Sequence, residues 1–299
     1  MPPTFKPAPL PKTWRTSRFD LDLREPLVMG IVNVTPDSFS DGGVHATTPQ
    51  ALRQAEQLLH EGANILDIGA ESTRPGAEAL PLAEELMRLE PLLRELVRWK
   101  VPISVDTYKP QVMQACLDWG VDIINDIWAL RQPGAQQVVA EHTRCGICLM
   151  HMHRDPKTMQ SQPMTGHVVS EVNAFLRSRI DALLDSGVHA SRVVVDPGIG
   201  FGKTVAQNFQ LLARQADLLR SGVPILAGWS RKSALGAALA QGDRVPEPSQ
   251  RQVASVAAAL MSVERGASVV RVHDVKATVD AIKIWLAMQQ QAGCHEVGG

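Results

Sequence analysis

Short apolar runs alternate with helical patterns along almost the whole chain, and this alternation constrains the fold more than any other feature. Eight runs rich in β-branched or apolar residues begin near Leu27, Asn64, Val101, Val121, Gly146, Arg192, Val223 and Ser268. Each run has the length of a strand that is buried on both faces. Between them, apolar residues recur on one helical face near 50–61, 81–99, 110–119, 132–143, 168–186, 205–220, 232–240, 249–265 and 276–290. The pattern predicts a parallel sheet.

The number of repeats indicates how this sheet is arranged. Eight strand and helix units in about 250 core residues are typical of an α/β fold with a single (β/α)8 TIM barrel. An open, doubly wound sheet is the alternative, but no internal linker marks a second domain. We expect a disordered N-terminal arm over 1–18, which is rich in Pro and Lys, a catalytic barrel over 19–290, and a C-terminal tail over 291–299.

Composition and charge exclude several classes of protein. The formal net charge of −1 provides no basic field for nucleic acid. The longest strongly apolar helical run, Val253 to Val263, is too short to span a bilayer. Four cysteines are too few for a disulfide framework, and no signal peptide is apparent at the N-terminus. We therefore expect a cytoplasmic protein that binds neither nucleic acid nor a membrane.

Polar residues occur where the predicted strands end. These are Asn33, Asp67, Asp106, Asn125, Asp126, His151 and Asp196, followed by the segments SRKS (230–233) and RVHD (271–274). A single polar residue at such a position often only marks the exit of the chain to solvent. In a barrel, however, the carboxyl ends of all strands meet at one mouth, where chemistry gathers. The set therefore predicts a site for a polar ligand that makes many hydrogen bonds.

The two kinds of polar side chain separate along the chain. The middle strands provide acceptors suited to a flat heterocycle with adjacent N–H donors, namely Asp106, Asn125, Asp126 and Asp196. Cationic groups suited to an anion are Arg74, Lys232, Arg271 and His273. The last strand neighbours the first in a closed barrel, so Asn33 is expected beside Arg271. Its amide oxygen is suited to help hold Mg²⁺ on a pyrophosphate.

Several of these residues have a simpler interpretation. An ion pair with Asp274 would account for Arg271 and His273, and an exposed helical lysine would account for Lys232. Ser230 is predicted to be the N-cap of the helix that carries Lys232.

Three other short patterns are weak indicators of function. The stretch DPGIGFGKT (196–204) misses both the P-loop and the dinucleotide patterns by one residue. The pair Cys145 and Cys148 enters an apolar run, and residues three apart on a strand face opposite sides, which favours a structural role. No carboxylate or third histidine lies near His151 and His153 to complete a metal site.

Eight motifs resemble those of the dihydropteroate synthase family of pterin-binding enzymes. They are MGIVNVTPDSFSDGG (29–43), DIGAESTRPGA (67–77), SVDT-K (104–109), INDI (124–127), LMHM (149–152), DPGIGFGKT (196–204), GWSRKSALG (228–236) and RVHDV (271–275). The resemblance covers roughly residues 20–288. Ala70, Tyr108, Trp128, Ala129, His153, Arg154 and Trp229 depart from the family pattern, and none of them removes a charged member of the predicted ring.

The resemblance implies a condensation of 6-hydroxymethyl-7,8-dihydropterin pyrophosphate with 4-aminobenzoate to give 7,8-dihydropteroate and pyrophosphate. Asp106, Asn125, Asp196 and Lys232 would hold the pterin. Asn33, Thr73, Arg74, Arg271 and His273 would hold the pyrophosphate, with Mg²⁺ at Asn33. Phe39, Thr73, Phe201, Lys232 and Ser233 would form the 4-aminobenzoate site, and Arg74, Lys232, Arg271 and His273 would serve catalysis. Lys203 has no phosphate role on this interpretation.

The helical pattern over 249–265 is apolar or small on nearly every side, whereas an outer barrel helix should have one polar side. Together with the resemblance, this predicts a homodimer through helices near 249–265 and 276–290. Three alternative functions remain open: a catalytically weakened pterin-binding homologue, a pterin-dependent methyltransferase, and a Schiff-base aldolase that uses Lys232.

Overall fold

The computed structural model describes residues 10–34, 43–71, 79–155, 158–159 and 161–293, and it confirms the TIM barrel. Eight parallel strands close into a barrel in the order β10-β3-β4-β5-β6-β7-β8-β9. Their bounds are β3 Leu27–Asn33, β4 Ile65–Gly69, β5 Ile103–Asp106, β6 Ile123–Asp126, β7 Gly146–Met150, β8 Val193–Asp196, β9 Ile225–Ala227 and β10 Ala267–Val272. The last strand pairs with the first, Arg271 opposite Met29, which closes the sheet.

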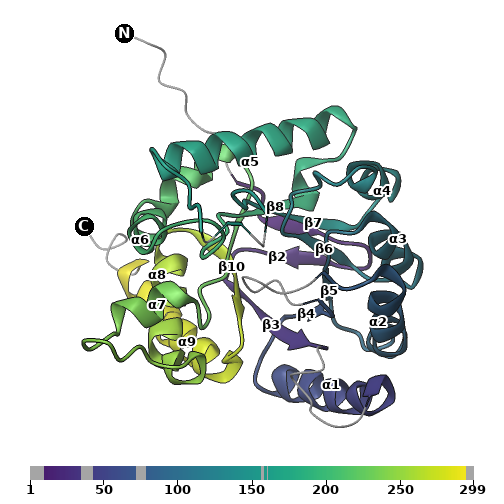
Figure 1. Cartoon of the computed structure of the whole chain (residues 1–299), viewed down its shortest axis with the longest axis horizontal. Helices are drawn as coiled ribbons and strands as arrows, with labels where there is room; N and C mark the ends of the chain where they lie inside the picture. The colour runs from purple at the N-terminus through teal and green to yellow at the C-terminus, as the bar shows by residue number, and fades with distance from the viewer. Residues whose placement is uncertain (1–9, 35–42, 72–78, 156–157, 160, 294–299) are drawn as a thin grey trace.

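Helices surround the strands on the outside (Figure 1). They are α1 Gly43–His60, α2 Leu82–Leu96, α3 Pro110–Asp118, α4 Ala135–Glu141, α5 Val168–Asp185, α6 Val205–Ala213, α7 Ser233–Ala238, α8 Gln252–Glu264 and α9 Val275–Gly293. The pattern expected over 205–220 is divided at Arg214, whose dihedrals (φ −113°, ψ 21°) leave the helical range, and a 3₁₀ helix follows over Gln215–Ser221. Across the described residues, no helix has the length and apolarity needed to cross a membrane.

The strands are buried on both faces because each face meets a different apolar layer. Outward side chains such as Ile124, Leu149 and Val195 pack in one cluster with helical residues. Inward side chains from seven strands form a separate cluster inside the barrel: Met29, Ile65, Ile123, Cys148, Val194, Leu226 and Val269. Cys145 belongs to the outer cluster and Cys148 to the inner one, so the two thiols face opposite sides of the sheet as predicted.

Residues 10–18 differ from the expected disordered arm. They contain β1 Thr13–Arg15, which pairs antiparallel with β2 Asp20–Asp22. Trp14 is fully buried in the inner barrel cluster, and its Nε1 donates to the carbonyl oxygen of Arg192 at 2.9 Å. The prediction was wrong here because a single Trp gives no periodic signal, although it buries enough apolar surface to order a short segment. Residues 1–9 lie outside the described part of the chain.

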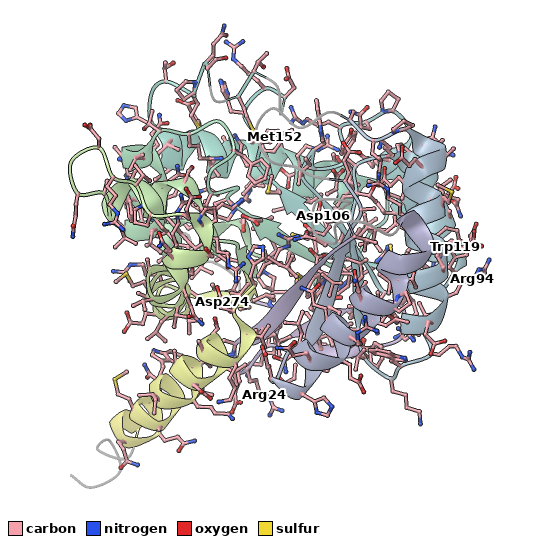
Figure 2. The ribbon with its side chains drawn as sticks, turned by 60° about the horizontal axis from the view of Figure 1, so that its bottom comes forward. Arg24, Arg94, Asp106, Trp119, Met152 and Asp274 are labelled. Carbon is pink, nitrogen blue, oxygen red and sulfur yellow. The ribbon has the colours of Figure 1, made fainter. Side chains whose placement is uncertain are left out.

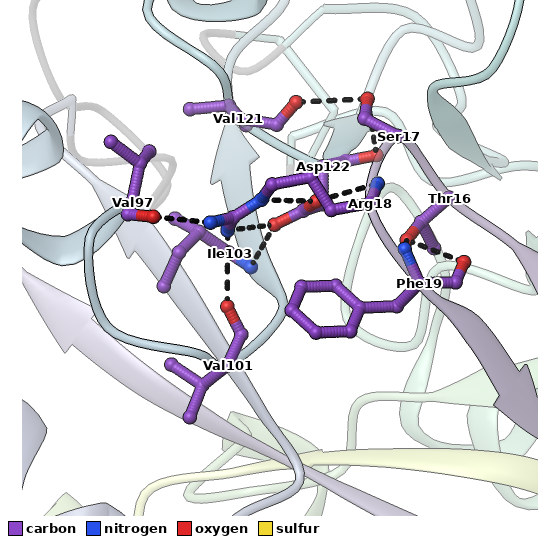
Figure 3. Close-up of polar contacts among 9 residues, drawn as sticks. All are labelled: Thr16, Ser17, Arg18, Phe19, Val97, Val101, Ile103, Val121 and Asp122. Carbon is purple, nitrogen blue, oxygen red and sulfur yellow. Dashed lines mark hydrogen bonds and ion pairs between the residues drawn. The ribbon is translucent and has the colours of Figure 1, made fainter.

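A polar contact fastens this hairpin to the barrel (Figure 3). Arg18 Nε donates to Asp122 Oδ1 at 2.9 Å, and Nη2 donates to Asp122 Oδ2 at 2.5 Å. Asp122 is fully buried and also accepts from the backbone N–H of Ile103 at 2.9 Å. The hairpin therefore seals the amino-terminal end of the barrel, which leaves the opposite end for the site. At the other terminus, α9 continues to Gly293, beyond the expected boundary at residue 290.

Candidate active site

The carboxyl ends of the strands bring the predicted pterin acceptors together. Asp106 ends β5, Asn125 lies one residue before the end of β6, and Asp196 ends β8. All three are buried, with exposed fractions of 9%, 5% and 6%. Figure 2 shows Asp106 centrally among the strand ends, whereas Arg94 lies on the outer helix α2. The strand ends thus place acceptors at the mouth of the barrel.

Arg271 links the acceptors to the cationic side of the mouth. Its Nε donates to Asp67 Oδ2 at 2.6 Å, and its Nη2 donates to Asp106 Oδ2 at 3.0 Å. Asn125 Nδ2 donates to the same Asp67 oxygen at 3.3 Å. Burial lowers the pKa of Arg271, but Asp67 and Asp106 raise it more, so the guanidinium stays charged. The predicted proximity of cations and acceptors is confirmed for Arg271, Asp106 and Asn125.

Two buried oxygens in this network have no partner among the described residues, Asp67 Oδ1 and Asp106 Oδ1. An unsatisfied buried acceptor costs free energy, and a ligand donor removes that cost. Burial raises the pKa of Asp106 to about 7, with Arg271 opposing the shift. A ligand that presents N–H groups to Asp106 would stabilise its ionised form.

Asp196 is held in place by the glycine-rich turn that follows it. Its Oδ1 accepts from the N–H of Gly198 at 2.7 Å, and burial raises its pKa. Its Oδ2 lies 3.6 Å from the position that a Cβ on Gly228 would occupy. Gly198 has φ +68°, and a Cβ there would lie 1.8 Å from the carbonyl oxygen of His151. Only glycine fits this close approach, which keeps Asp196 at the mouth.

Lys203 does not face outward to a phosphate, in agreement with the sequence interpretation. Its ammonium donates to the carbonyl oxygens of Gly198 at 2.8 Å, Phe201 at 3.1 Å and His151 at 3.3 Å. Burial lowers its pKa to about 7. Lys203 therefore holds the turn together from inside.

Lys232 lies against the same turn, beside Gly200 and Phe201. Its ammonium is 4.3 Å from the ring centroid of Phe201, a cation–π contact. A Cβ on Gly200 would lie 3.2 Å from Lys232 Cδ, so this glycine leaves room for the lysine stem. Burial and, to a smaller extent, the nearby Arg271 lower the pKa of Lys232 to about 8. Lys232 is therefore not the exposed helical lysine of the simpler interpretation.

Ser230 is not the N-cap of α7, contrary to the prediction. Lys232 occupies that position without a side-chain cap, because Arg231 has φ +59° and turns the chain before the helix begins. Ser230 Oγ instead lies 3.0 Å from His273 Nδ1 and accepts from the backbone N–H of His273 at 3.1 Å. Ser230 thus orients His273 between β9 and β10.

The alternative ion pair between Arg271 and Asp274 is also wrong. Asp274 pairs with Arg231, whose Nη2 donates to Oδ1 at 2.8 Å. Arg271 and Asp274 are three residues apart and diverge where β10 ends. Arg271 turns into the barrel toward Asp67. Asp274, labelled in Figure 2, directly precedes α9.

Asp126 and His151 do not join the ring of ligand acceptors. Asp126 accepts from the backbone N–H groups of Trp128 at 2.7 Å and Leu130 at 2.6 Å, so its carboxylate organises its own loop. Burial raises its pKa to about 7. The His151 ring packs edge-on against Phe175 of α5 at 4.9 Å, and burial lowers its pKa to about 2. Among the described residues, no group of three or more His, Cys, Asp or Glu could hold a metal ion.

The structure gives the position of two further predicted residues, Asn33 and Ser233, and does not describe the other three. Asn33 is the last residue of β3. A Cβ built on Gly69 would lie 3.8 Å from Asn33 Oδ1 and 3.7 Å from Asp106 Cβ, so Asn33 and Asp106 both border Gly69. Ser233 is the first residue of α7 and is exposed. Phe39, Thr73 and Arg74 lie outside the described residues, so their predicted roles stay predictions.

Asp67 is the site residue that the sequence interpretation left without a role. It is fully buried and binds both Arg271 and Asn125. Ile65, two residues earlier on β4, faces the barrel interior. Because side chains alternate along a strand, the same parity places Asp67 inside the barrel, and a charged residue at an interior position was the available signal.

Comparisons with known proteins agree with this geometry. Residues 29–273 match the family model described as pterin binding enzyme. A dihydropteroate synthase from Neisseria meningitidis serogroup B is 48% identical over 280 residues, which cover 92% of this chain and 97% of that protein. A crystal structure of Burkholderia cenocepacia dihydropteroate synthase complexed with 7,8-dihydropteroate superposes with a TM-score of 0.84 at 48% identity, covering 95% of this chain and 99% of that one. A structure of the Xanthomonas albilineans dihydropteroate synthase with 4-aminobenzoic acid gives a TM-score of 0.85 at 48% identity, covering 93% and 98%.

Proposed function

Because the chain belongs to the dihydropteroate synthase family of pterin-binding enzymes, we propose that it condenses 6-hydroxymethyl-7,8-dihydropterin pyrophosphate with 4-aminobenzoate. The products are 7,8-dihydropteroate and pyrophosphate. The observation that carries the proposal is the shared mouth of the barrel. There Asp106 has one unpartnered buried oxygen, and Arg271 contacts the other oxygen of the same carboxylate.

The acceptor half of the mouth suits the pterin. A pterin edge presents adjacent N–H donors, and Asp106 and Asp196 provide buried carboxylates at the ends of β5 and β8. Asn125 adds an amide between them, anchored by Asp67. The ammonium of Lys232 is suited to donate to an oxygen or ring nitrogen of the bound pterin. Charged hydrogen bonds of this kind are each worth roughly 1.5–3 kcal/mol, so they dominate pterin affinity.

The cationic half suits the pyrophosphate. Arg271 and His273 lie on the same inward-facing side of the last strand and its extension, and Ser230 fixes the His273 ring. Thr73 and Arg74 are assigned to the pyrophosphate only because of the family resemblance. A guanidinium binds phosphate oxygens in two parallel hydrogen bonds, which orients the leaving group as well as neutralising it.

The oxygen ligands around Asn33 fit Mg²⁺ only when the ion is bound together with the substrate pyrophosphate. Asn33 offers a single amide oxygen, and Arg271 binds one oxygen of each of the nearby carboxylates Asp67 and Asp106. Mg²⁺ typically keeps several waters and binds through one or two protein ligands plus substrate phosphates, which matches this set. When bound, the ion would neutralise charge on the pyrophosphate.

Phe201 and Lys232 form the described part of the 4-aminobenzoate site that we propose. Their cation–π contact places an aromatic face and a positive charge side by side, which suits an aromatic carboxylate. Ser233 follows as the first residue of α7, whose N-cap residue Lys232 makes no side-chain capping hydrogen bond. Phe39 and Thr73 would complete this site from segments outside the described residues.

The reaction requires no protein nucleophile, because the arylamine is already neutral and attacks the exocyclic methylene of the pterin. The carbon–oxygen bond to the pyrophosphate breaks as the carbon–nitrogen bond forms, and the amine then releases one proton. The protein supplies orientation and electrostatic stabilisation of the departing anion. Lys232 carries its charge below its pKa of about 8, so it can stabilise that anion near neutral pH.

Release of pyrophosphate tests the proposal. We expect release only when the pterin pyrophosphate and 4-aminobenzoate are both present, with equimolar dihydropteroate as the second product. Pterin binding without turnover would identify a catalytically weakened homologue. Methyl transfer to an added acceptor would identify a pterin-dependent methyltransferase, and trapping of a substrate on Lys232 by borohydride would identify an aldolase. Any of these three results contradicts the proposal.

We also propose a homodimer in the cytoplasm. The outer faces of α8 and α9 expose large apolar side chains: Val253 at 83%, Ile284 at 74%, Met288 at 53% and Met261 at 45%. Exposed apolar side chains gathered on neighbouring helices are typical of a protein interface. The free, buried Cys116, Cys145 and Cys148 suit a reducing compartment. Light scattering at micromolar concentration should give the mass of a dimer, and a monomer would contradict this proposal.

A further inference from the structure

A second cluster of charged groups lies beside the mouth and has no role in the proposed chemistry. Its centre is Lys109, which follows β5 and precedes α3. The ammonium donates to Glu71 Oε2, to Glu85 Oε2 and to the carbonyl oxygen of Leu80, each at 2.5 Å. One cation therefore connects three acceptors from different parts of the chain.

The positions of these acceptors in the chain indicate what the cluster connects. Glu71 comes two residues after β4, and Leu80 comes two residues before α2. They border the segment 72–78, which lies outside the described residues. Glu85 lies in the first turn of α2. Lys109 therefore ties both ends of the connection between β4 and α2 to the end of β5.

The two residues before Lys109 strengthen the same attachment. Tyr108 donates its phenolic O–H to Glu71 Oε1 at 2.8 Å, and Thr107 donates its hydroxyl to Glu85 Oε1 at 2.8 Å. Each carboxylate thus uses both of its oxygens. Asp106, the proposed pterin acceptor, comes directly before these three residues. The strand end that binds the pterin and the attachment of the neighbouring connection are therefore one continuous stretch, Asp106 to Lys109.

The burial of the cluster argues against a role in stability alone. Side-chain exposure is 15% for Lys109, 9% for Glu71 and 1% for Glu85. Burial raises the pKa of Glu85, although Lys109 and Thr107 oppose the shift. Desolvation of buried charges commonly offsets their mutual attraction, so apolar side chains of similar volume would hold these elements together as well. A buried network with fixed donors and acceptors does, however, define one geometry for the groups it joins.

We propose that Lys109 is a positioning residue that sets the ends of the β4–α2 connection relative to the bound pterin. The proposal rests on the proposed function, because the family resemblance assigns Thr73 and Arg74 of this connection to pyrophosphate and 4-aminobenzoate. The Lys109 ammonium donates to Glu71, Glu85 and Leu80, so it is expected to act through these residues and not on a substrate. Its loss should therefore affect the use of the second substrate and leave the pterin acceptors in place.

The main test variant is Glu71→Gln, which removes one charge, keeps the shape, and leaves the Lys109–Glu85 pair intact. Lys109→Met is the stronger variant, and Lys109→Arg should restore part of its loss. Lys100→Met is the matched control, because Lys100 is exposed and lies just before β5. For Glu71→Gln we expect kcat/KM for 4-aminobenzoate to fall by about tenfold, the effect of losing roughly one charged hydrogen bond. The Kd of a pterin ligand, measured by calorimetry, should stay within about twofold of wild type.

Hydrogen exchange provides a readout that does not depend on turnover. Peptides covering residues 70–81 should exchange faster in Glu71→Gln and Lys109→Met than in Lys100→Met, while peptides from β6 and β8 remain unchanged. If the wild-type protein shows no pyrophosphate release, the proposed function fails, and the exchange data still test the attachment.

Two results would overturn the inference. In the first, Glu71→Gln lowers only the melting temperature and leaves exchange and kcat/KM at control values, which shows a purely structural role. In the second, pterin affinity falls as much as 4-aminobenzoate use, which shows that the cluster acts on β5 itself. Because Glu71→Gln retains the Lys109–Glu85 pair, the test stands even if Lys109→Met does not fold.

Discussion

Arg271 reaches across the barrel mouth to Asp67, with Nε 2.6 Å from Asp67 Oδ2. Arg271 lies on β10 and Asp67 on β4, with β3 between the two strands. The same guanidinium donates to Asp106. The groups proposed for the pyrophosphate and for the pterin therefore share hydrogen bonds. Because Asp67 and Asp106 bind the same guanidinium, Asp67 influences both halves of the site.

Asp67→Asn should impair catalysis without unfolding the barrel. The amide has the same shape, but it cannot neutralise Arg271 and places an N–H beside that guanidinium or beside the Asn125 amide. We expect kcat/KM for the pterin pyrophosphate to fall by about 10- to 100-fold, since interactions with charged groups are worth roughly 1.5–3 kcal/mol. Steady-state kinetics check this, with the exposed Asp118→Asn as control. Wild-type kinetics in Asp67→Asn would show that Arg271 needs no orienting partner.

Asp196→Ala should damage pterin binding severely. Its two carboxylate oxygens are proposed to accept a pair of N–H bonds, and the loss of such a pair corresponds to roughly a hundredfold or more in affinity. Calorimetry with a pterin ligand measures the change. Asp196→Asn retains the shape and the contact with the Gly198 N–H, so it separates the loss of charge from the loss of the turn. Unchanged pterin affinity in both variants would refute the assignment.

Arg271→Ala should remove the response of 4-aminobenzoate binding to pyrophosphate. In the wild-type protein we expect pyrophosphate to tighten 4-aminobenzoate binding, because the anion recruits Arg271 and the neighbouring cations. Titrations with labelled 4-aminobenzoate, with and without pyrophosphate, measure this coupling. Lys232→Ala should instead weaken 4-aminobenzoate binding directly, because Lys232 contacts the ring of Phe201. A mutant at Arg271 that still responds to pyrophosphate would show that the role is wrong.

Activity should depend on pH through Asp106 and Lys232. The pKa of Asp106 is raised to about 7, so below that pH its carboxyl group is increasingly protonated and accepts fewer N–H bonds. The pKa of Lys232 is lowered to about 8, so above that pH the ammonium loses its charge. We therefore expect kcat/KM for the pterin pyrophosphate to be highest between about pH 7 and 8 and to fall on both sides.

The variant Lys232→Arg tests whether Lys232 causes the decrease in kcat/KM at alkaline pH. Arginine stays protonated throughout the accessible range, so the decrease above pH 8 should disappear even if the maximal rate is lower. The raised pKa of Asp196 contributes to the acid side in the same direction as Asp106. An alkaline decrease that persists in Lys232→Arg would assign that limb to another group.

The alternation of side chains along each strand decided how much of the site could be predicted. The order of strands and helices, the barrel and the acceptors Asp106, Asn125 and Asp196 followed from apolar runs that end in polar residues. Asp126 was wrongly grouped with them. Ile124, two residues before it, packs in the outer cluster, so Asp126 faces its own loop. A count in steps of two from a known interior residue shows whether a strand-end residue faces the inside or the outside of the barrel. The last polar residue of each apolar run does not give this information.

Contacts between distant segments could not be predicted from local patterns. The partners of Arg271 lie 204 and 165 residues away, and nothing within RVHD indicates that Arg271 turns inward to Asp67 while Asp274 pairs with Arg231. Ser230 was assigned to a helix cap because serine favours that position. The left-handed conformation of Arg231 moves the start of α7 and frees Ser230 for His273. These outcomes depend on the closed barrel, which brings β9, β10 and β4 to one end.

Trp14→Ala should lower stability and leave ligand binding unchanged. Trp14 is fully buried among inward residues of seven strands at the end of the barrel opposite the site, and its indole N–H satisfies the carbonyl oxygen of Arg192. Truncation of a buried Trp costs about 3–5 kcal/mol in free energy of unfolding, so urea denaturation should show a lower midpoint. Trp14→Phe keeps most of the apolar surface but loses the indole N–H and part of the ring volume, so it should cost less, about 1–3 kcal/mol. Because Trp14 lies at the end of the barrel opposite the described site residues, calorimetry should give a wild-type Kd for the pterin ligand under native conditions. If Trp14→Ala weakens pterin binding while the protein stays folded, the two ends of the barrel are coupled, and the hairpin would be part of the functional site rather than a seal on the core.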